Sequence, residues 1–592
     1  MDNQRNIILA VLLTALVLFG WDAAVGYFYP QADTPTKVEQ QGGADAAVSP
    51  TKPTREGGLR DATDLALEKK DLDQALAEGG RVPIEAPGIS GSINLKGAVI
   101  DDLVLNRHRE TVKKDSGPVR LFSPAGTPAQ QFAQFGWVGE GVQVPNAGTV
   151  WQVADGAKLT PSTPVTLTTR NGAGQVFTLT FAVDDNYLIT AKQTLGNAGN
   201  GAVAVQPFGL LNRTDKTASL DTWNVHSGPI GAFDGSVSFG PNYDDLVDDG
   251  TVAPAGRANW AGFTDVYWMS AIAPVNARAE GTFRSLGNNL FRADVIYDPV
   301  VVQPGQQVSR TSKLFAGAKE HTVLDAYEAG GITNFGLAID WGWFRWFEKP
   351  IFWVLISLFN LVGNFGVAII LLTCIVRGIM FPVAQRGFAS MAAMKAIQPK
   401  MKAIQDRYKD DKQKQQQEIM KLYKDEGVNP VAGCLPMLLQ IPVFFALYKV
   451  LILAIEMRHQ PFVLWIKDLS APDPLHILNL FGLLPFDPPS FLGIGILALL
   501  LGITMFLQFK LNPAQMDPIQ QQMFMIMPWF MMFIMAPFAA GLLIYWITSN
   551  LLTIAQQKYL YSRHPQLKAQ ADKDAADRKR AAERDKTAKG GA

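Results

Sequence analysis

Long apolar runs in the second half of the chain constrain its fold more than any other feature. A helix needs about 20 residues to cross the ~30 Å hydrocarbon core of a bilayer. Residues 31–330 read as an ordinary aqueous domain, so the 48% apolar content of the 592 residues is very unevenly distributed. We therefore predict a multi-domain membrane protein with a helical core of five transmembrane helices, at residues 351–383, 431–455, 491–511, 523–538 and 539–557.

A further apolar run lies at the N-terminus. Residues 7–29 are apolar apart from Thr14 and Asp22, a pattern that cleaved signal peptides and retained anchors share. The run is long enough to span, which favours a transmembrane anchor at residues 1–30. Residues 31–56 are rich in Pro, Gly, Ala, Gln and Thr, which is typical of a flexible linker.

Residues 57–334 carry many short strand patterns. Val165–Thr169 and Val176–Val183 flank a turn that contains Asn171-Gly172, a strong hairpin signal. Similar patterns at Tyr187–Leu195 and Arg292–Val302, without alternating helices, predict a large antiparallel β-sandwich. The six histidines of the whole chain are scattered without metal-ligand spacing, so we expect no metal, no cofactor and no catalytic site. A scaffold or a docking surface is the simplest role for such a domain.

Residues 335–350 are rich in aromatic side chains. Phe335, Ile339, Trp343, Trp346 and Phe347 recur at helical spacing, which predicts an amphipathic helix in the membrane interface. The alternative is a Trp-rich corner of the sandwich.

Lysine and arginine placement indicates the orientation. Residues 384–430 and the tail at 558–592 hold ten basic residues each, whereas the loop at 456–490 holds two. The basic segments are therefore expected in the cytoplasm, with a short cytoplasmic loop at 512–522, both termini inside and the large domain outside. Apolar residues at spacings of three and four predict a helical hairpin at 384–430. The hairpin and the tail either pack on themselves with solvated charges or dock a nascent chain or ribosome.

Arg377 is the most unusual residue of the core. The run 351–383 is too long for one crossing, so its early part, which contains Asn360, Gly363 and Asn364, is expected near the outer interface. A crossing at about Phe365–Gln385 then places Arg377 ~12 Å from the inner end, beyond comfortable snorkelling reach. A bare charge there would cost several kcal/mol, so Arg377 needs water or a partner.

Other spans offer polar groups that would suit a shared hydrated cavity. Thr373 lies one helical turn before Arg377. The further candidates for the cavity are Gln440, Tyr545, Trp546 and Asn550, with Thr548 and Ser549 beside them. The alternative for each is ordinary hydrogen bonding between packed helices, which fits Thr548 and Ser549 best. For Arg377 the alternative is snorkelling.

Several separate motifs, in the same order, resemble the YidC family of membrane insertases. They are VRGIMFP at 376–382, Asn429-Pro430, GCLP at 433–436, QIP at 440–442 and GLLIYWITSN at 541–550. Residues 91–105, GSINLKGAVIDDLVL, resemble the start of the periplasmic domain in Gram-negative members. The resemblance implies a galactose-mutarotase-like sandwich in the periplasm and a groove open to the cytoplasm and lipid. It also implies that Arg377 is the groove arginine, with Thr373 and Trp546 at positions where substrates lie.

The expected function is insertion and folding of inner-membrane proteins without ATP hydrolysis, in a bacterial inner membrane. Expected partners are nascent membrane proteins, membrane lipids, the Sec translocon and, through the hairpin and tail, the ribosome. A secondary transporter is the alternative, but its paired broken helices are not evident in the five core spans. A periplasmic carbohydrate enzyme is a third possibility, although the sequence offers no acid–base pair for it.

Overall fold

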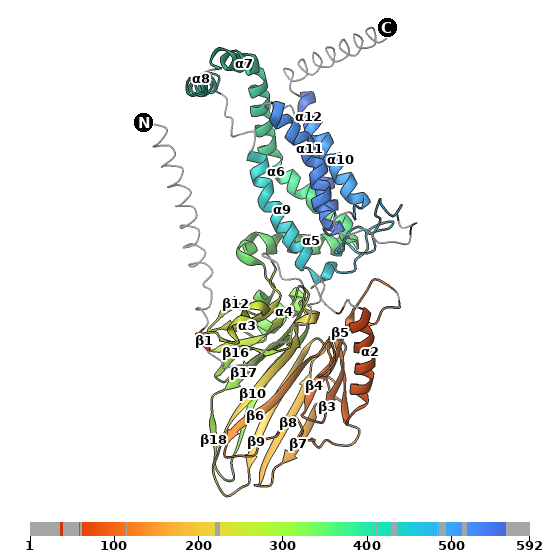
Figure 1. The fold of residues 1–592 in the computed structure, drawn as a ribbon, viewed down its shortest axis with the longest axis vertical. Coiled ribbons are helices and arrows are strands. Elements are labelled where there is room, and N and C mark those ends of the chain that lie inside the picture. The colour runs from red at the N-terminus through yellow and green to blue at the C-terminus, as the bar shows by residue number, and fades with distance from the viewer. Residues whose placement is uncertain are drawn as a thin grey trace. The chain divides into compact units, whose positions relative to one another are not determined.

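A computed structural model describes residues 36–38, 59, 62–113, 115–219, 225–409, 411–427, 435–481, 484, 493–511 and 518–563 (Figure 1). The chain divides into two compact units. The strand-rich unit comprises Met1–Arg345 with Leu453–Ile455, and the helical unit comprises Trp346–Ile452 with Glu456–Ala592. The predicted anchor at 1–30 and the tail beyond residue 563 lie outside the described residues, so both stay predictions.

The strand-rich unit contains two antiparallel sheets. The first has 11 strands, in the order β1-β13-β16-β17-β10-β6-β4-β3-β2, with β18 beside β10 and β5 beside β4. Its strands are β1 (Thr36–Val38), β2 (Arg81–Glu85), β3 (Ile89–Asn94), β4 (Val99–Arg109), β5 (Pro118–Phe122), β6 (Gln131–Glu140), β10 (Val203–Thr214), β13 (Thr251–Ala253), β16 (Ala279–Gly287), β17 (Leu290–Tyr297) and β18 (Val300–Val302).

The second sheet has 8 strands, in the order β12-β11-β14-β15-β19-β9-β8-β7. They are β7 (Val165–Arg170), β8 (Gln175–Val183), β9 (Leu188–Asn197), β11 (Gly228–Phe233), β12 (Ser236–Phe239), β14 (Ala258–Thr264), β15 (Trp268–Val275) and β19 (Gln307–Ala318). The unit also contains the short helices η1 (Asp215–Thr217), α3 (Tyr243–Asp249) and α4 (His321–Ala329). The predicted antiparallel β-sandwich is confirmed.

The sandwich core follows from alternation along the strands. In β8, Phe177, Leu179 and Phe181 are fully buried, while the threonines between them face the other side. The predicted hairpin is confirmed, because β7 pairs with β8 across residues 171–174. Asn171 Oδ1 shapes this turn by accepting hydrogen bonds from the backbone N–H groups of Ala173 and Gln175, at 3.1 and 2.9 Å.

Buried polar groups link the two sheets. Gln131 Nε2 on β6 donates to Ser270 Oγ on β15 at 3.1 Å, and Gln193 Nε2 on β9 donates to the Gly136 carbonyl at 2.6 Å. Each bond satisfies a group that would otherwise be costly to bury. The segment Arg292–Val302, expected as one strand, forms two strands instead. Both β17 and β18 pair with β10, and the break coincides with Pro299, which cannot donate to a ladder.

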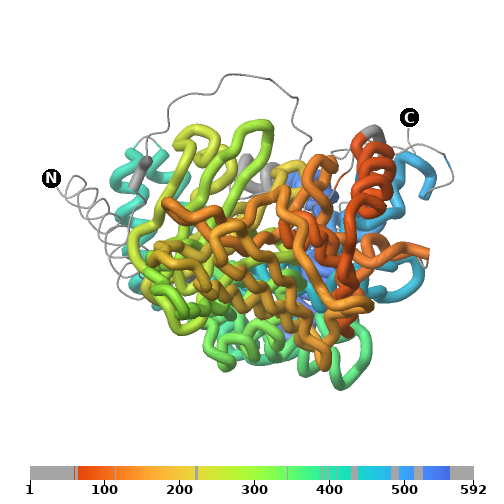
Figure 2. The backbone as a smooth tube through the Cα atoms, turned by 90° about the horizontal axis from the view of Figure 1, so that it is seen from below, coloured from red at the N-terminus to blue at the C-terminus, as the bar shows by residue number. Residues whose placement is uncertain are grey.

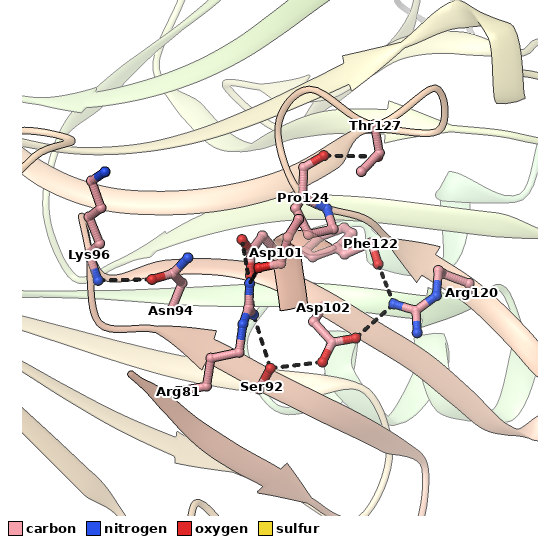
Figure 3. Close-up of polar contacts among 11 residues, drawn as sticks. Arg81, Ser92, Asn94, Lys96, Asp101, Asp102, Arg120, Phe122, Pro124 and Thr127 are labelled. Carbon is pink, nitrogen blue, oxygen red and sulfur yellow. Dashed lines mark hydrogen bonds and ion pairs between the residues drawn. The ribbon is translucent and has the colours of Figure 1, made fainter. Parts of the chain in front are cut away.

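An ion-pair network secures the sheet edge at the segment that suggested a periplasmic domain (Figure 3). Arg81 donates to Asp101 at 2.8 Å and to Ser92 at 3.0 Å, and Ser92 donates to Asp102 at 2.8 Å. Arg120 pairs with Asp102 at 2.7 Å. The β3–β4 pairing contains a bulge, and Asp101 is the residue of β4 that has no partner on β3. The bulge interrupts the regular alternation of side chains along β4, so the adjacent carboxylates of Asp101 and Asp102 can join the same network. Burial raises the pKa of Asp101, although Arg81 opposes this shift.

Helix α2 (Ala62–Ala77) lies beside this edge in both backbone views (Figures 1 and 2). Arg81 Nη2 donates to the Ala75 carbonyl at 3.3 Å, and Glu68 accepts from the Ala129 N–H at 2.8 Å. In the region expected to be a flexible linker, Thr36–Val38 pair with β13 as an edge strand. Most of residues 31–56 lie outside the described residues, so the rest of the linker stays a prediction.

The predicted helix at residues 335–350 is wrong as a single element. Residues 335–344 form two short turns, η2 (Phe335–Ala338) and η3 (Gly342–Phe344), before α5 (Arg345–Val362) begins. Phe335 is buried in the strand-rich unit, edge-on to Trp260 and Phe315. The first part is therefore the aromatic corner of the sandwich, and only the part from Arg345 onward is helical. On α5, Trp346 and Trp353 are largely exposed, as an interfacial helix requires.

The helical unit holds the apolar helices. They are α6 (Phe365–Ala396), α9 (Leu435–Leu453), α10 (Ile496–Leu511), α11 (Pro518–Met535) and α12 (Ala540–Arg563), with η5 (Ile455–Met457) after α9. Among the described residues, one helical segment, Phe365–Gly387, is long and apolar enough to cross a membrane, and three shorter apolar segments lie in α9, α10 and α11. The expected crossing from Phe365 is thus matched, whereas the count of five core spans stays a prediction.

The segment 384–430 contains a helical hairpin, but its bounds differ from those expected. Helix α6 continues to Ala396, and the hairpin consists of α7 (Gln398–Arg407) and α8 (Lys412–Asp425). Lys400 pairs with Glu426, and Tyr423 Oη donates to Met401 Sδ at 3.3 Å, so the two helices run antiparallel. This is the self-packed arrangement, and it leaves the docking role untested.

Candidate functional site

Helices α6 and α12 bring Arg377 against a hydroxyl group. Arg377 Nε donates to Ser549 Oγ at 3.1 Å, and Arg377 Nη2 donates to the same oxygen at 2.5 Å. Ser549 is buried and Arg377 is half-buried. Within the described residues no carboxylate pairs with Arg377. A neutral oxygen therefore holds a cation that usually has an anionic partner when it is buried.

Tyr545 and Gln440 form the second part of the cluster. Tyr545 lies one turn before Ser549 on α12 and is 2% exposed. Gln440 Nε2 on α9 donates to Tyr545 Oη. Gln440 Oε1 is also buried, and no described group donates to it. Three helices thus contribute to one polar cluster, and the cluster holds an amide oxygen that a water molecule or a substrate group can satisfy.

Thr373 is on α6, one turn before Arg377, and is 1% exposed. Its hydroxyl donates to the Ile369 carbonyl at 2.6 Å. That bond uses the hydroxyl proton, so Thr373 Oγ1 can offer a further group only its lone pairs. Such a bond to the preceding turn is a common way for threonine to satisfy itself inside a helix.

Trp546 joins an aromatic group rather than the polar cluster. Its ring lies 4.9 Å from that of Phe444 on α9, centre to centre. Phe444 also stacks on Tyr448, which lies 5.9 Å from Phe538. Phe444 was not among the residues predicted for the site. The available signal was its position one helical turn after Gln440, which gives α9 a face that is polar at Gln440 and aromatic from Phe444 onward.

Asn550 faces a different helix. Its Nδ2 donates to Thr504 Oγ1 on α10 at 3.2 Å, and both residues are buried. This bond is the ordinary helix–helix hydrogen bonding that was the alternative for Asn550. Asn550 is therefore not part of the cluster around Arg377. Ser549, by contrast, was named beside the cavity candidates with helix packing as the better-fitting alternative, and it is the direct partner of Arg377. The spacing of Tyr545 and Ser549 on one face of α12 was the signal that could have indicated it.

The cluster suits electrostatic binding rather than covalent chemistry. A guanidinium carries five N–H donors, and only two nitrogens of Arg377 are bonded within the described part of the chain. A carboxylate is a stronger acceptor than a serine hydroxyl, so it can compete for these donors. No group of three His, Cys, Asp or Glu residues suited to a metal occurs among the residues described.

Each of the two units matches a known protein family. Residues 357–568 match the family described as 60Kd inner membrane protein, and residues 81–354 match the YidC periplasmic domain. Two relatives are named membrane protein insertase YidC. The one from Zymomonas mobilis is 45% identical over 98% of both chains. The one from Beijerinckia indica is 43% identical over 95% of this chain and 96% of its own.

The chain therefore belongs to the YidC family of membrane protein insertases, and the family expected from the motifs is confirmed. It is an inner-membrane protein, and its relatives are named as insertases rather than as enzymes or transporters.

Solved structures similar to the chain include two kinds of protein. An active YidC insertase with its first transmembrane domain resolved covers 83% of this chain and 97% of its own, with 18% identity and a TM-score of 0.35. A galactose mutarotase related enzyme from Lactobacillus acidophilus covers 40% of this chain and 97% of its own, with 12% identity and a TM-score of 0.30.

Proposed function

We propose that the chain inserts membrane proteins through a hydrated groove in which Arg377 attracts the polar tail of the substrate. The observation that carries the proposal is the pairing of Arg377 with Ser549, a neutral partner, beside the buried Gln440 oxygen. Trp546 and Phe444 supply an aromatic surface next to these polar groups. Such a surface suits the apolar helix of a substrate, while the cluster suits its tail.

The physical role of the cluster follows from the two halves of a substrate. Its apolar helix gains free energy on entering lipid, whereas the flanking tail must cross hydrocarbon at a cost of several kcal/mol per charge. A wet path that extends partway across shortens the apolar distance. Arg377 would lower the free energy of an acidic tail in this path by direct pairing. The burial of the substrate helix supplies the driving force, so no ATP is required.

The topology is part of the proposal. Basic residues on α7, α8 and the C-terminal tail favour a cytoplasmic location for these segments. The strand-rich unit and the loop between α9 and α10 are then periplasmic. In this orientation the cluster is accessible to nascent chains from the cytoplasm. The helices α7 and α8 would then provide a binding surface for the ribosome. The Sec translocon and lipids complete the set of proposed partners.

The test is insertion of a single-span substrate with an acidic external tail into vesicles that contain the purified protein. We expect Arg377→Ala to lower insertion about tenfold or more, because a charge-assisted contact contributes about 1.5–3 kcal/mol. Arg377→Lys should keep much of the activity. Arg386→Ala is the matched control, since Arg386 is exposed on the same helix. Full activity in Arg377→Ala would refute the electrostatic role.

A further inference from the structure

The loop between α9 and α10 has a rigid attachment to the helical unit. Asp473 is 1% exposed, and its Oδ1 accepts hydrogen bonds from Trp465 Nε1 and the Leu475 N–H, both at 3.0 Å. Its Oδ2 accepts from the Leu497 N–H at 2.8 Å, in the first turn of α10. One buried carboxylate thus joins two parts of the loop to the start of a helix, where a negative charge is favourable.

The far part of this loop presents large apolar side chains outward. Leu478, Leu480 and Phe481 are 48%, 52% and 50% exposed. The backbone beneath them is hydrogen-bonded, with the Phe481 N–H donating to the His476 carbonyl at 2.9 Å and the Ile477 N–H donating to the Ile494 carbonyl at 3.0 Å. These side chains are therefore exposed on an ordered support.

The backbone conformation at these residues is unusual. Leu480 and Phe481 have φ angles of 50° and 60°, and Leu464, elsewhere in the same loop, has a φ of 55° and is 76% exposed. Bulky residues rarely adopt this left-handed conformation, which costs about 1–2 kcal/mol each. A backbone held this way needs a compensating interaction. Within the described chain these side chains do not obtain it by burial.

The chemistry of the segment favours lipid as the missing environment. Residues 474–486 are part of the loop that joins α9 to α10, and they contain no Asp, Glu, Lys or Arg. On α10, which follows, the exposed residues Leu500, Ile503, Leu507 and Leu511 recur at three and four residues and form one apolar stripe. The loop therefore continues an apolar surface that already suits lipid.

We propose that Leu464, Leu480 and Phe481 enter the outer leaflet of the bilayer at headgroup level and anchor the outer end of α10. The proposal rests on the topology given above, which places this loop outside. Amphipathic and apolar loop residues bind such interfaces through buried apolar area. Because Asp473 fixes the loop to α10, the anchor would also set the depth of that helix in the membrane.

The experiment uses the full chain in which Cys374 and Cys434 are replaced by serine. Single cysteines at Leu464→Cys and Leu480→Cys carry an NBD fluorophore, and the labelled proteins are reconstituted in vesicles of phosphatidylcholine and phosphatidylglycerol. Quenching by lipids spin-labelled near the carbonyl end of the acyl chain is compared with quenching by aqueous iodide. The controls are Ile503→Cys in the α10 stripe and Lys467→Cys, an exposed charged position of the same loop.

We expect the probes at Leu464 and Leu480 to be quenched by the spin-labelled lipid, as the Ile503 probe is, and the Lys467 probe to be quenched by iodide. Iodide quenching at Leu464 and Leu480 would overturn the lipid anchor. Protection from both quenchers would also overturn it, because it would indicate a protein partner. Labelling of Lys467→Cys from outside intact spheroplasts tests the topology separately, so failure of the topology and failure of the anchor are distinguishable.

Discussion

Replacing Ser549 by alanine tests whether the cluster around Arg377 is wet. The substitution removes the single oxygen that accepts two N–H groups of Arg377, at 3.1 and 2.5 Å. Within the described residues no carboxylate is available as a substitute. The consequence then depends on what replaces the hydroxyl.

The two possible environments give different magnitudes. In a dry site, loss of a hydrogen bond to a charged group costs about 1.5–3 kcal/mol, and the unpaired charge adds to that cost. In a hydrated groove, water takes the place of the hydroxyl, and the cost falls to about 0–1 kcal/mol. We expect the smaller value for Ser549→Ala.

The assay is the free energy of unfolding in lipid bicelles, measured by steric trapping. Thr504→Ala is the matched control, because Thr504 accepts a hydrogen bond from Asn550 at 3.2 Å and both residues are buried between α10 and α12. That variant leaves a buried amide donor unsatisfied, at about 1–2 kcal/mol. The hydrated account requires Ser549→Ala to be the milder change. If it destabilises the protein more than Thr504→Ala does, the reasoning fails.

Two further predictions concern the helical and strand-rich units. A Cβ at Gly366 would lie 2.0 Å from the Phe462 ring, whereas a Cβ at Gly378 meets nothing within 4 Å. Thermal unfolding should therefore show Gly366→Ala destabilised by about 1–3 kcal/mol and Gly378→Ala unchanged or slightly stabilised; equal melting temperatures would contradict the close packing. Burial alone would raise the pKa of Glu320, but hydrogen bonds from His108 and Tyr187 outweigh it and hold that pKa below the ordinary 4.5. Because the folded-state pKa is depressed, this stabilisation is present above pH 4.5 and is lost as the pH falls through the folded value. The strand signal in circular dichroism should show a smaller loss of thermal stability on acidification for Glu320→Gln than for the parent, and identical profiles would refute the assignment.

The sequence predicts the parts of the fold that depend on local pattern and length. The start of the crossing at Phe365 followed from the length a membrane span allows, and α5 does end at Val362, just before Gly363 with a φ of 69°. The β7–β8 hairpin followed from alternation and a turn residue. In both cases neighbours in sequence carry the information.

Long-range contacts explain the failures. The aromatic spacing from Phe335 onward fits a helix equally well, and only burial against Trp260 and Phe315 shows that it closes the sandwich. Ser549 and Asn550 are adjacent in sequence and equally polar. Their roles differ because α12 turns one toward Arg377 and the other toward Thr504. Which helix lies on which face cannot be read from a single apolar segment.

The most direct test of the central claim is reversal of charge at Arg377. Insertion into purified vesicles is measured for two single-span substrates that differ only in an external tail carrying aspartates or lysines. The account predicts that Arg377→Glu lowers insertion of the acidic tail and raises that of the basic tail relative to the parent protein. Equal effects of the substitution on both tails would contradict an electrostatic role for Arg377.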